Sequence, residues 1–310
     1  MRRSAVIALS AGALLSVSAL SAPAQAATTA PAAAAAPTVS AKGAFVLNNA
    51  SSATVYSKAA DTRRQMASTT KIMTAAVVLS TKGVDLNRKV TVKQAYRDYV
   101  AKEGASTADL RTGDKLTVRQ LLYGTMLPSG CDAAYALADT YGTGSTNAAR
   151  TKSFIAKMNA KAKELKLTNT KFDSFDGISG GGNNYTTPRD LAKIAQYAMK
   201  NANFRAVVKA TSYKAAAPAA NGGTRTYTWY NTNQLLGSYS GAIGIKTGTG
   251  TAAGPCLVFA ATRGSKTLVG VVLSGTDRYK DAAKMLDHGF GASTAKTMKL
   301  RTLPSNAQRD

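Results

Sequence analysis

The chain has 310 residues, of which 45% are hydrophobic, and it carries 40 lysines and arginines against 16 acidic residues. The hydrophobic content excludes a disordered or fibrous protein, and the length allows one large domain or two lobes built together. The formal net charge of +24 is informative about partners and solubility rather than about chemistry. A solvated basic surface without a dedicated partner is the alternative explanation of this charge.

The first 26 residues have the pattern of a secretory signal peptide. Arg2 and Arg3 precede an apolar run from Ala5 to Leu20, and the small residues Ala-Gln-Ala end at Ala26. We therefore expect cleavage near Ala26 and export to the cell envelope, with an uncleaved anchor as the alternative. Losing two arginines lowers the net charge from +24 to +22. In that compartment an anionic envelope surface is the expected partner, rather than nucleic acid.

Residues 27–42 are rich in alanine, proline and threonine without apolar periodicity, which is typical of a disordered tether. The fold is predicted to begin at Gly43 with a β-hairpin over residues 43–58. A helix begins at Thr69, behind a cap of small polar residues. Further helices are predicted over residues 117–127, 131–142, 148–167, 187–201 and 278–290, and strands over 240–249, 255–264 and 266–275.

Strands at both ends of the chain flank a helical middle. This order favours an α+β protein whose terminal segments share one sheet, with a helical region inserted between them. We expect one domain over residues 43–290, with a sheet lobe at about 43–84 and 211–290 and a helical lobe at about 85–210. The basic residues 291–310 are interpreted as a short frayed tail, with peripheral membrane contact as the alternative.

Ser68 and Lys71 stand three residues apart in ASTTKIMTA, so both side chains lie on one face of the predicted helix. A neutral lysine at this place could accept the serine proton. Its pKa, about 10.4 in a model peptide, would have to fall by roughly three units through burial and a nearby cation. Taken alone, the pair is more simply explained as a plain helix cap.

Two further motifs change this interpretation. Ser129-Gly130-Cys131 opens a predicted helix, and Lys246-Thr247-Gly248 ends an apolar strand. Together with Ser-x-x-Lys they form, in the same order and in the required structural settings, the signature of penicillin-binding proteins and class A β-lactamases. The three motifs therefore predict a serine acyl-transfer site.

From about Gly43 to Phe290 the chain resembles the low-molecular-weight serine D-alanyl-D-alanine peptidases, a family of penicillin-binding proteins. The stretches that carry the resemblance are ASTTKIMTA, LLYGTMLPSGCDAAYALA, KFDSFDGISGGGNNYTTPRDLAKIA and GIKTGTGTAAGPCLVFAATRG. The Ser-Gly-Cys triplet is similar to that of compact actinomycete D,D-transpeptidases. The resemblance implies a penicillin-binding protein/β-lactamase-like fold, in which an antiparallel sheet flanked by helices and an all-helical lobe enclose the catalytic cleft.

The resemblance also implies roles for the first two motifs. Ser68 would attack the carbonyl of the penultimate D-alanine of a peptidoglycan stem peptide and form an acyl-enzyme, with Lys71 as the base. Ser129 would relay a proton to the leaving D-alanine. β-Lactam antibiotics would acylate the same serine and act as inhibitors.

The third motif would hold the substrate. Lys246 and Thr247 would bind its terminal carboxylate, and Gly248 would let the strand edge approach its backbone closely. The backbone N–H groups of Ser68 and Thr249 would form the oxyanion hole.

Cys131 departs from the family, which usually has asparagine here. A thiol is a weaker hydrogen-bond donor and acceptor than an amide, so we expect an altered donor or acceptor preference rather than an inactive enzyme. Cys131 as the nucleophile is the alternative, but no histidine stands near it, and His288 in the closing helix is interpreted as structural. Cys256 lies in an apolar strand and is interpreted as a buried, unreactive core residue. A disulfide between Cys131 and Cys256 is the alternative, because an oxidising compartment permits one.

Several other functions stay open. A class A β-lactamase needs a glutamate for deacylation, and the chain has only Glu103 and Glu164, the latter interpreted as a solvated helix residue. A non-catalytic wall-binding protein with this fold would be expected to lack Ser68, Lys71 or Lys246, and all three are present here. The motifs do not separate transpeptidation from carboxypeptidation, and the shared Ser-Gly-Cys favours the former. The run Gly180-Gly181-Gly182 is interpreted as a loop near the cleft, and no cofactor or metal is expected.

Overall fold

The computed structural model describes residues 1, 5–8, 12 and 35–308. Met1–Ala35 and Ala36–Asp310 form two separate units. The predicted signal peptide and residues 27–34 of the predicted tether fall largely outside the described residues, so both stay predictions. In the part of the chain that is described, no helix is long and apolar enough to cross a membrane.

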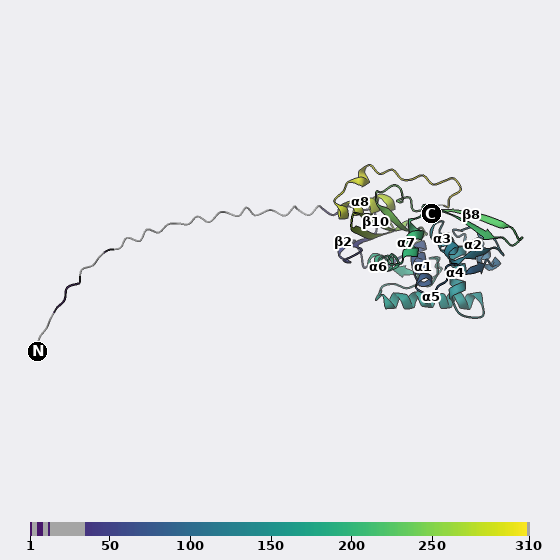
Figure 1. Ribbon diagram of the computed structural model, residues 1–310, viewed down its shortest axis with the longest axis horizontal. Helices are drawn as coiled ribbons and strands as arrows, with labels where there is room; N and C mark the ends of the chain where they lie inside the picture. The colour runs from purple at the N-terminus through teal and green to yellow at the C-terminus, as the bar shows by residue number, and fades with distance from the viewer. Residues whose placement is uncertain (2–4, 9–11, 13–34, 309–310) are drawn as a thin grey trace. The chain divides into compact units, whose positions relative to one another are not determined.

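The second unit alternates helices and strands (Figure 1). Its helices are α1 (Lys71–Leu79), α2 (Gln94–Glu103), α3 (Val118–Met126), α4 (Cys131–Tyr141), α5 (Asn147–Glu164), α6 (Pro188–Ala198), α7 (Ala202–Lys209) and α8 (Arg278–Phe290), with the 3-10 turns η1 (Ala67–Thr70) and η2 (Thr294–Lys296). Its strands are β1 (Gly43–Asn48), β2 (Thr54–Lys58), β3 (Arg64–Gln65), β4 (Lys89–Thr91), β5 (Lys115–Thr117), β6 (Tyr185–Thr186), β7 (Ser212–Pro218), β8 (Thr224–Tyr230), β9 (Ala242–Gly248), β10 (Cys256–Arg263) and β11 (Lys266–Leu273).

A five-stranded antiparallel sheet has the strand order β2-β1-β11-β10-β9. Strand β1, at the start of the fold, pairs with β11 near its end, with Gly43 opposite Leu273 and Asn48 opposite Leu268. The prediction that the terminal segments share one sheet is therefore confirmed, and so is the hairpin β1–β2. Strand β9 lies at the edge of the sheet, and its residues from Gly244 to Gly248 are buried.

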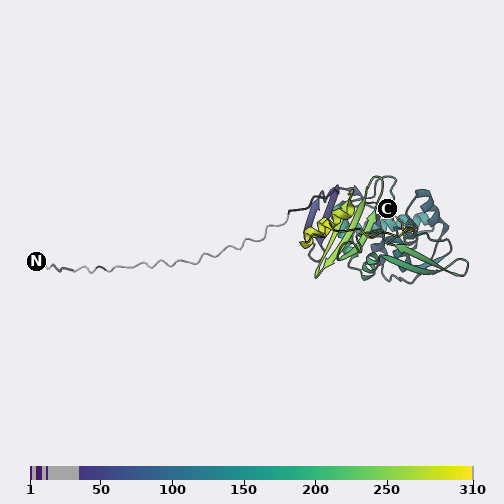
Figure 2. The same ribbon diagram turned by 90° about the horizontal axis from the view of Figure 1, so that it is seen from above.

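Helices cover both faces of this sheet. Phe45 and Leu47 of β1 belong to an apolar cluster shared with α1 and α6, whereas Ala44 and Val46 belong to a cluster that includes buried residues of α8. The alternation follows from the two-residue period of a strand. In Figure 2 the yellow helix α8 lies across the strands.

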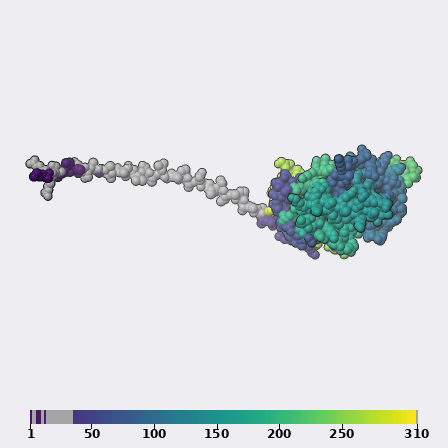
Figure 3. Space-filling model, turned by 90° about the horizontal axis from the view of Figure 1, so that it is seen from below, coloured from purple at the N-terminus to yellow at the C-terminus, as the bar shows by residue number. Residues whose placement is uncertain are grey.

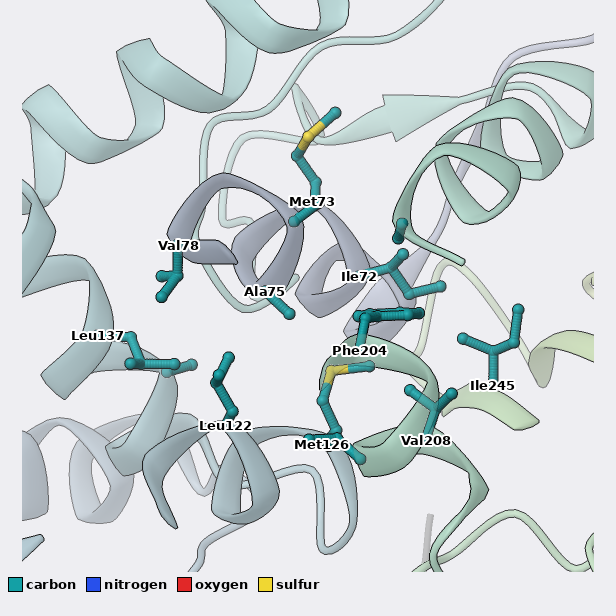
Figure 4. Packing of buried hydrophobic residues seen from close by; sticks show 14 of the residues in the cluster. Ile72, Met73, Ala75, Val78, Leu122, Met126, Leu137, Phe204, Val208 and Ile245 are labelled. Carbon is teal, nitrogen blue, oxygen red and sulfur yellow. The ribbon is translucent and has the colours of Figure 1, made fainter. Parts of the chain in front are cut away.

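Helix α1 lies at the centre of the second unit. Every residue from Lys71 to Leu79 is buried, and a helix that is apolar on all sides is expected to lie in a protein core. Figure 4 shows α1 surrounded by side chains from α3, α4, α7 and β9. The labelled residues are Ile72, Met73, Ala75 and Val78 of α1, Leu122 and Met126 of α3, Leu137 of α4, Phe204 and Val208 of α7, and Ile245 of β9. This packing holds the start of α1 in place.

Helix α5 forms an outer layer of the helical region. It buries Phe154, Met158 and Ala162 on one side and exposes polar residues on the other, as expected for a surface helix. In Figure 1 it lies along the lower edge of the second unit, and the face of that unit seen in Figure 3 is formed largely by teal residues of this part of the chain.

The elements that were not predicted from the sequence include α2, α7 and the hairpin β7–β8. Helix α2 buries only Tyr96 and therefore lacks an apolar stripe. The hairpin forms a two-stranded sheet of its own. Its Tyr213 ring stacks on Tyr123 of α3 with ring centroids 3.7 Å apart, and Trp229 donates a hydrogen bond of 2.8 Å to the carbonyl of Ala108. Residues 212–230 thus pack against the helical region.

Both ends of the predicted domain differ from expectation. Val39 and Ala41 are buried, and the backbone N–H of Ala41 bonds the carboxylate of Asp281 at 2.9 Å, so the packed chain begins before Gly43. The predicted frayed tail is wrong where it contains Arg301. That guanidinium donates hydrogen bonds to the backbone carbonyls of Asn231, Asn233 and Leu236, a distant turn that no local sequence pattern relates to the tail.

Asp114 ties the hairpin to the rest of the fold, and its substitution should weaken the protein. The buried carboxylate accepts hydrogen bonds from Arg225 at 2.7 Å, Tyr227 at 2.6 Å and the amide of Ala220 at 3.0 Å. Burial acts to raise the pKa of Asp114, but these hydrogen bonds outweigh it and hold the pKa below its usual value. Stability from this group is therefore present above the unfolded pKa of about 3.9 and is lost as the pH falls through the folded value.

We expect Asp114→Asn to lower the free energy of unfolding by about 2 kcal/mol at pH 7, because a charge-assisted acceptor is lost. The difference should shrink as the pH falls below about 4. Thermal unfolding followed by circular dichroism at several pH values checks this. Asp109→Asn is the control, since the Asp109 side chain is 62% exposed. Equal stability of Asp114→Asn and the unmodified protein at pH 7 would contradict the prediction.

Candidate active site

Ser68 and Lys71 lie at the junction of η1 and α1 and face each other. Lys71 Nζ is 2.9 Å from Ser68 Oγ, and the Lys71 side chain is fully buried whereas Ser68 is half-buried. The three-residue spacing on continuous helical backbone brings the two groups together. The Ser-x-x-Lys pair therefore has the hydrogen bond that a nucleophile and its base require.

The Lys71 amine has two further partners, Cys131 Sγ at 3.3 Å and the backbone carbonyl of Asp176 at 2.9 Å. A neutral amine has two N–H donors and one lone pair. In the structure the Lys71 amine donates to Ser68 Oγ, Cys131 Sγ and the Asp176 carbonyl. A neutral Lys71 that kept its two donors on Cys131 and Asp176 would direct its lone pair to Ser68 and could accept the serine proton.

Asp176 and Tyr99 complete this network, and sequence reasoning missed both. The Tyr99 hydroxyl donates a hydrogen bond of 2.8 Å to the Asp176 carboxylate, which also accepts one of 2.8 Å from Ser174. Burial, followed by the negative charge of Asp176, raises the pKa of Tyr99, so the phenol stays protonated and remains a donor. These contacts fix the carbonyl of Asp176 beside Lys71.

Cys131 lines the site but does not resemble a nucleophile. Its side chain is buried, and burial raises the pKa of the thiol to about 12, so the thiol is neutral at pH 7. Reactive cysteines have a lowered pKa instead. Both Cys131 and Cys256 are free and buried, so the two do not form a disulfide.

Ser129 precedes Cys131 at the entrance of α4. It is fully buried with a φ of +64°, and its Oγ makes no hydrogen bond to any described residue. A buried hydroxyl normally has a partner. Its predicted part in proton relay stays a prediction.

The Lys-Thr-Gly motif lies at the end of the edge strand β9. A Cβ on Gly248 would lie 3.0 Å from the backbone nitrogens of Ser68 and Thr69, so only glycine lets β9 approach η1 this closely. Lys246 and Thr247 are buried. The Thr247 hydroxyl is 2.6 Å from that of Thr232, which holds it in place. Thr249 follows directly after the motif, at the end of β9 that packs against the amide of Ser68.

Arg278 is a site residue that sequence reasoning missed. Its Nη1 donates hydrogen bonds to the carbonyl of Gly248 at 3.1 Å, to Thr249 Oγ1 at 2.9 Å and to the carbonyl of Cys256 at 3.3 Å. The only sequence signal is an arginine at the first position of the closing helix α8. Its guanidinium adds positive charge beside the Lys-Thr-Gly motif, where a carboxylate is expected to bind.

A cavity of about 580 Å³ borders the first two motifs and Thr249, whereas Lys246, Thr247 and Gly248 do not line it. Ser68 and Cys131 line it, together with the end of α2, the glycine-rich loop and the residues that follow β9. Gly180 and Gly182 are among the lining residues, so the predicted position of that loop near the cleft is confirmed. The cavity is large enough for part of a peptide substrate.

Known proteins show the same organisation. A family model described as D-alanyl-D-alanine carboxypeptidase matches residues 30–277. A D-alanyl-D-alanine carboxypeptidase of Streptomyces sp. strain K15 is 56% identical over 294 residues, which cover 94% of this chain and 99% of that protein. A D-alanyl-D-alanine carboxypeptidase of Bacillus subtilis is 32% identical over 255 residues, and the match covers 81% of this chain and 62% of that protein.

A solved structure agrees with the sequence matches. The crystal structure of the Streptomyces K15 DD-transpeptidase superposes with a TM-score of 0.82 at 60% identity, and the match covers 83% of this chain and 99% of that one. The predicted α+β fold of a penicillin-binding protein is thereby confirmed. The chain belongs to the D-alanyl-D-alanine carboxypeptidase family and is a serine enzyme of the carboxypeptidase/transpeptidase type.

Proposed function

We propose that the chain is an exported D,D-transpeptidase that acts on peptidoglycan stem peptides ending in D-Ala-D-Ala through an acyl-enzyme on Ser68. The observation that carries the proposal is the hydrogen bond of 2.9 Å between Lys71 Nζ and Ser68 Oγ at the edge of a substrate-sized cavity. The same acyl-enzyme can pass to water, so carboxypeptidation is the alternative outcome.

Acylation begins with proton transfer from Ser68 Oγ to the Lys71 amine. The Oγ attacks the carbonyl carbon of the penultimate D-alanine, and the oxygen of the tetrahedral intermediate accepts hydrogen bonds from the N–H groups of Ser68 and Thr249. The C–N bond to the terminal D-alanine then breaks as its nitrogen receives the proton. Ser129 Oγ, which has no hydrogen-bond partner among the described residues, is available to carry that proton.

Substrate binding depends on charge. Lys246 and Arg278 flank the end of β9 and provide the positive charge that a terminal carboxylate requires. The hydroxyl of Thr247, held by Thr232, adds a hydrogen-bond donor. The bound carboxylate would set the distance from the peptide end to Ser68, and hence which carbonyl is attacked.

Two observations support transfer over hydrolysis of a β-lactam. The K15 protein, at 60% identity, is named a DD-transpeptidase. Glu164 lies on α5, is bound to Lys161 at 2.6 Å and does not line the cavity, so it is not placed as the base for rapid deacylation. For localisation we propose export, and the charge of +22 that remains after the loss of Arg2 and Arg3 supports attraction to an anionic envelope surface.

The test is to incubate residues 27–310 with benzylpenicillin and to follow the intact mass over hours. We expect one lasting adduct. A synthetic peptide ending in D-Ala-D-Ala should then release D-alanine and, with glycinamide present, give more amide than free acid. Free acid alone would identify a carboxypeptidase, and rapid loss of the antibiotic a β-lactamase. No adduct with intact antibiotic would favour a non-catalytic wall-binding protein.

A further inference from the structure

Glu103 contributes a carboxylate to the active-site cavity. It is the last residue of α2 and lines the same cavity as Ser68 and Cys131. Among the described residues that line this cavity, Glu103 alone carries a charge. Its side chain is 29% exposed, so it is accessible to a ligand in the cavity. In a chain with 40 basic and 16 acidic residues, this position has the opposite sign to the protein as a whole.

The fold does not explain this residue. A carboxylate in the last turn of a helix lies at the negative end of the helix dipole, where lysine or arginine is favoured instead. Its ion pair with Lys102, at 3.2 Å, involves a lysine side chain that is 80% exposed, and such pairs contribute little to stability. Helix α2 ends on Gly104, whose φ of +56° terminates it without help from Glu103.

Glu103 lies one turn of α2 after Tyr99. Its negative charge adds to the raised pKa of that phenol, after burial and the charge and hydrogen bond of Asp176. Tyr99 bonds Asp176, whose carbonyl accepts a hydrogen bond from Lys71. Glu103 therefore belongs to the helix whose Tyr99 reaches the base through Asp176, whereas Arg278 bonds the end of β9, which is proposed for the donor carboxylate.

Transpeptidation requires a second substrate that bears an amino group. At neutral pH this group is mostly an ammonium ion, which the net positive charge of the protein repels. A carboxylate in the cavity attracts it and raises its local concentration. We infer that Glu103 binds the ammonium group of the amino acceptor and raises the ratio of transfer to hydrolysis. The inference rests on the proposed acyl transfer through Ser68.

The chemistry balances without any further reactant. The bound ammonium ion releases one proton to water and becomes a free amine. Its nitrogen attacks the acyl carbon, so that the new C–N bond forms as the ester bond to Ser68 Oγ breaks. The second proton of that nitrogen passes through Lys71 to Ser68 Oγ, which restores the free serine. Glu103 positions the nitrogen, and its carboxylate is unchanged at the end of the cycle.

The test compares the unmodified enzyme with Glu103→Gln, using a synthetic peptide ending in D-Ala-D-Ala as the donor. Glycinamide is the cationic acceptor and hydroxylamine the neutral one. We expect Glu103→Gln to lower the amide-to-acid ratio with glycinamide roughly two- to fivefold at low salt, the range for a partly exposed charge pair, and to leave the ratio with hydroxylamine unchanged. Added salt should lower the glycinamide ratio of the unmodified enzyme but not that of the variant.

Glu164→Gln is the matched control, because Glu164 is the other glutamate of the chain and lies outside the cavity. It should behave like the unmodified enzyme with both acceptors. An unchanged glycinamide ratio in Glu103→Gln, or an equal fall with both acceptors, overturns the inference. A longer-lived benzylpenicillin adduct with an unchanged ratio also overturns it, since Glu103 would then assist hydrolysis. Failure of the unmodified enzyme to form any adduct instead overturns the proposed acyl transfer.

Discussion

Replacing Ser68 with alanine should abolish the covalent benzylpenicillin adduct and lower the release of D-alanine by about 10⁴-fold or more, since removal of a catalytic nucleophile leaves only binding and the oxyanion hole. The fold should be retained. Ser68 is half-buried, and its Oγ is bonded to Lys71 at 2.9 Å. The buried side chains of α1, which hold this part of the core together, are unchanged in the variant. Intact-mass spectrometry measures the adduct, and thermal unfolding reports the fold.

Cys131→Ala is the control for the choice of nucleophile. The Cys131 thiol is neutral and buried, and its Sγ lies 3.3 Å from Lys71 Nζ. Because it contacts the same base as Ser68, it is the alternative nucleophile that the experiment has to test. Cys131→Ala should still form the adduct. An adduct in Ser68→Ala that disappears in Cys131→Ala would show that the thiol is acylated instead.

Replacing Lys71 with methionine should lower the rate of acylation by roughly 10²- to 10⁴-fold, the usual contribution of a general base. Methionine has a similar length and no charge, so it fills the fully buried position without leaving a cavity. The hydroxyl of Ser68 then has no proton acceptor at 2.9 Å. Stopped-flow or quenched measurements of adduct formation at saturating benzylpenicillin give the rate.

The second buried lysine provides a matched comparison. Lys246→Met leaves Ser68 and Lys71 in contact and removes charge from the proposed carboxylate site beside Arg278. Lys246→Met should mainly raise the KM for the donor peptide, whereas Lys71→Met should mainly lower kcat. If both variants changed KM and kcat in the same way, the assignment of Lys71 as the base and Lys246 as a binding residue would be contradicted.

Together these predictions assign the two substrates to separate places. The end of β9, with Lys246 and Arg278, is proposed to hold the carboxylate of the donor peptide. The end of α2, with Glu103, is proposed to hold the ammonium group of the acceptor. Opposite charges at the two ends would keep each substrate from the other's place, because a like charge is repelled there.

The sequence by itself was sufficient for features that depend on local spacing. Ser68 and Lys71 meet because three residues on a helix span about one turn. The strands β9 to β11 are long apolar runs, and the caps and prolines mark α3 and α6. The three motifs and their order identified the family and the fold, and the comparison with known proteins confirmed both.

Weak local signals explain the elements that were missed. Helix α2 buries only Tyr96, so its residues show no apolar stripe. The strand β7 buries only small alanines, Ala215 and Ala217, and gains its stability from the contact of Tyr213 with Tyr123 on α3. Such elements are stabilised by partners elsewhere in the chain, and propensity alone does not reveal them.

Tertiary structure alone decided which distant residues complete the site. Asp176 orients Lys71 through a backbone carbonyl, which no side-chain motif records. Arg278 reaches Gly248 across 30 residues of sequence, and Glu103 joins the cavity of Ser68 from the end of another helix. The physical reason is the same in each case. A hydrogen bond or a shared cavity depends on distance in space, and only the packed sheet and helices bring these separate segments within that distance.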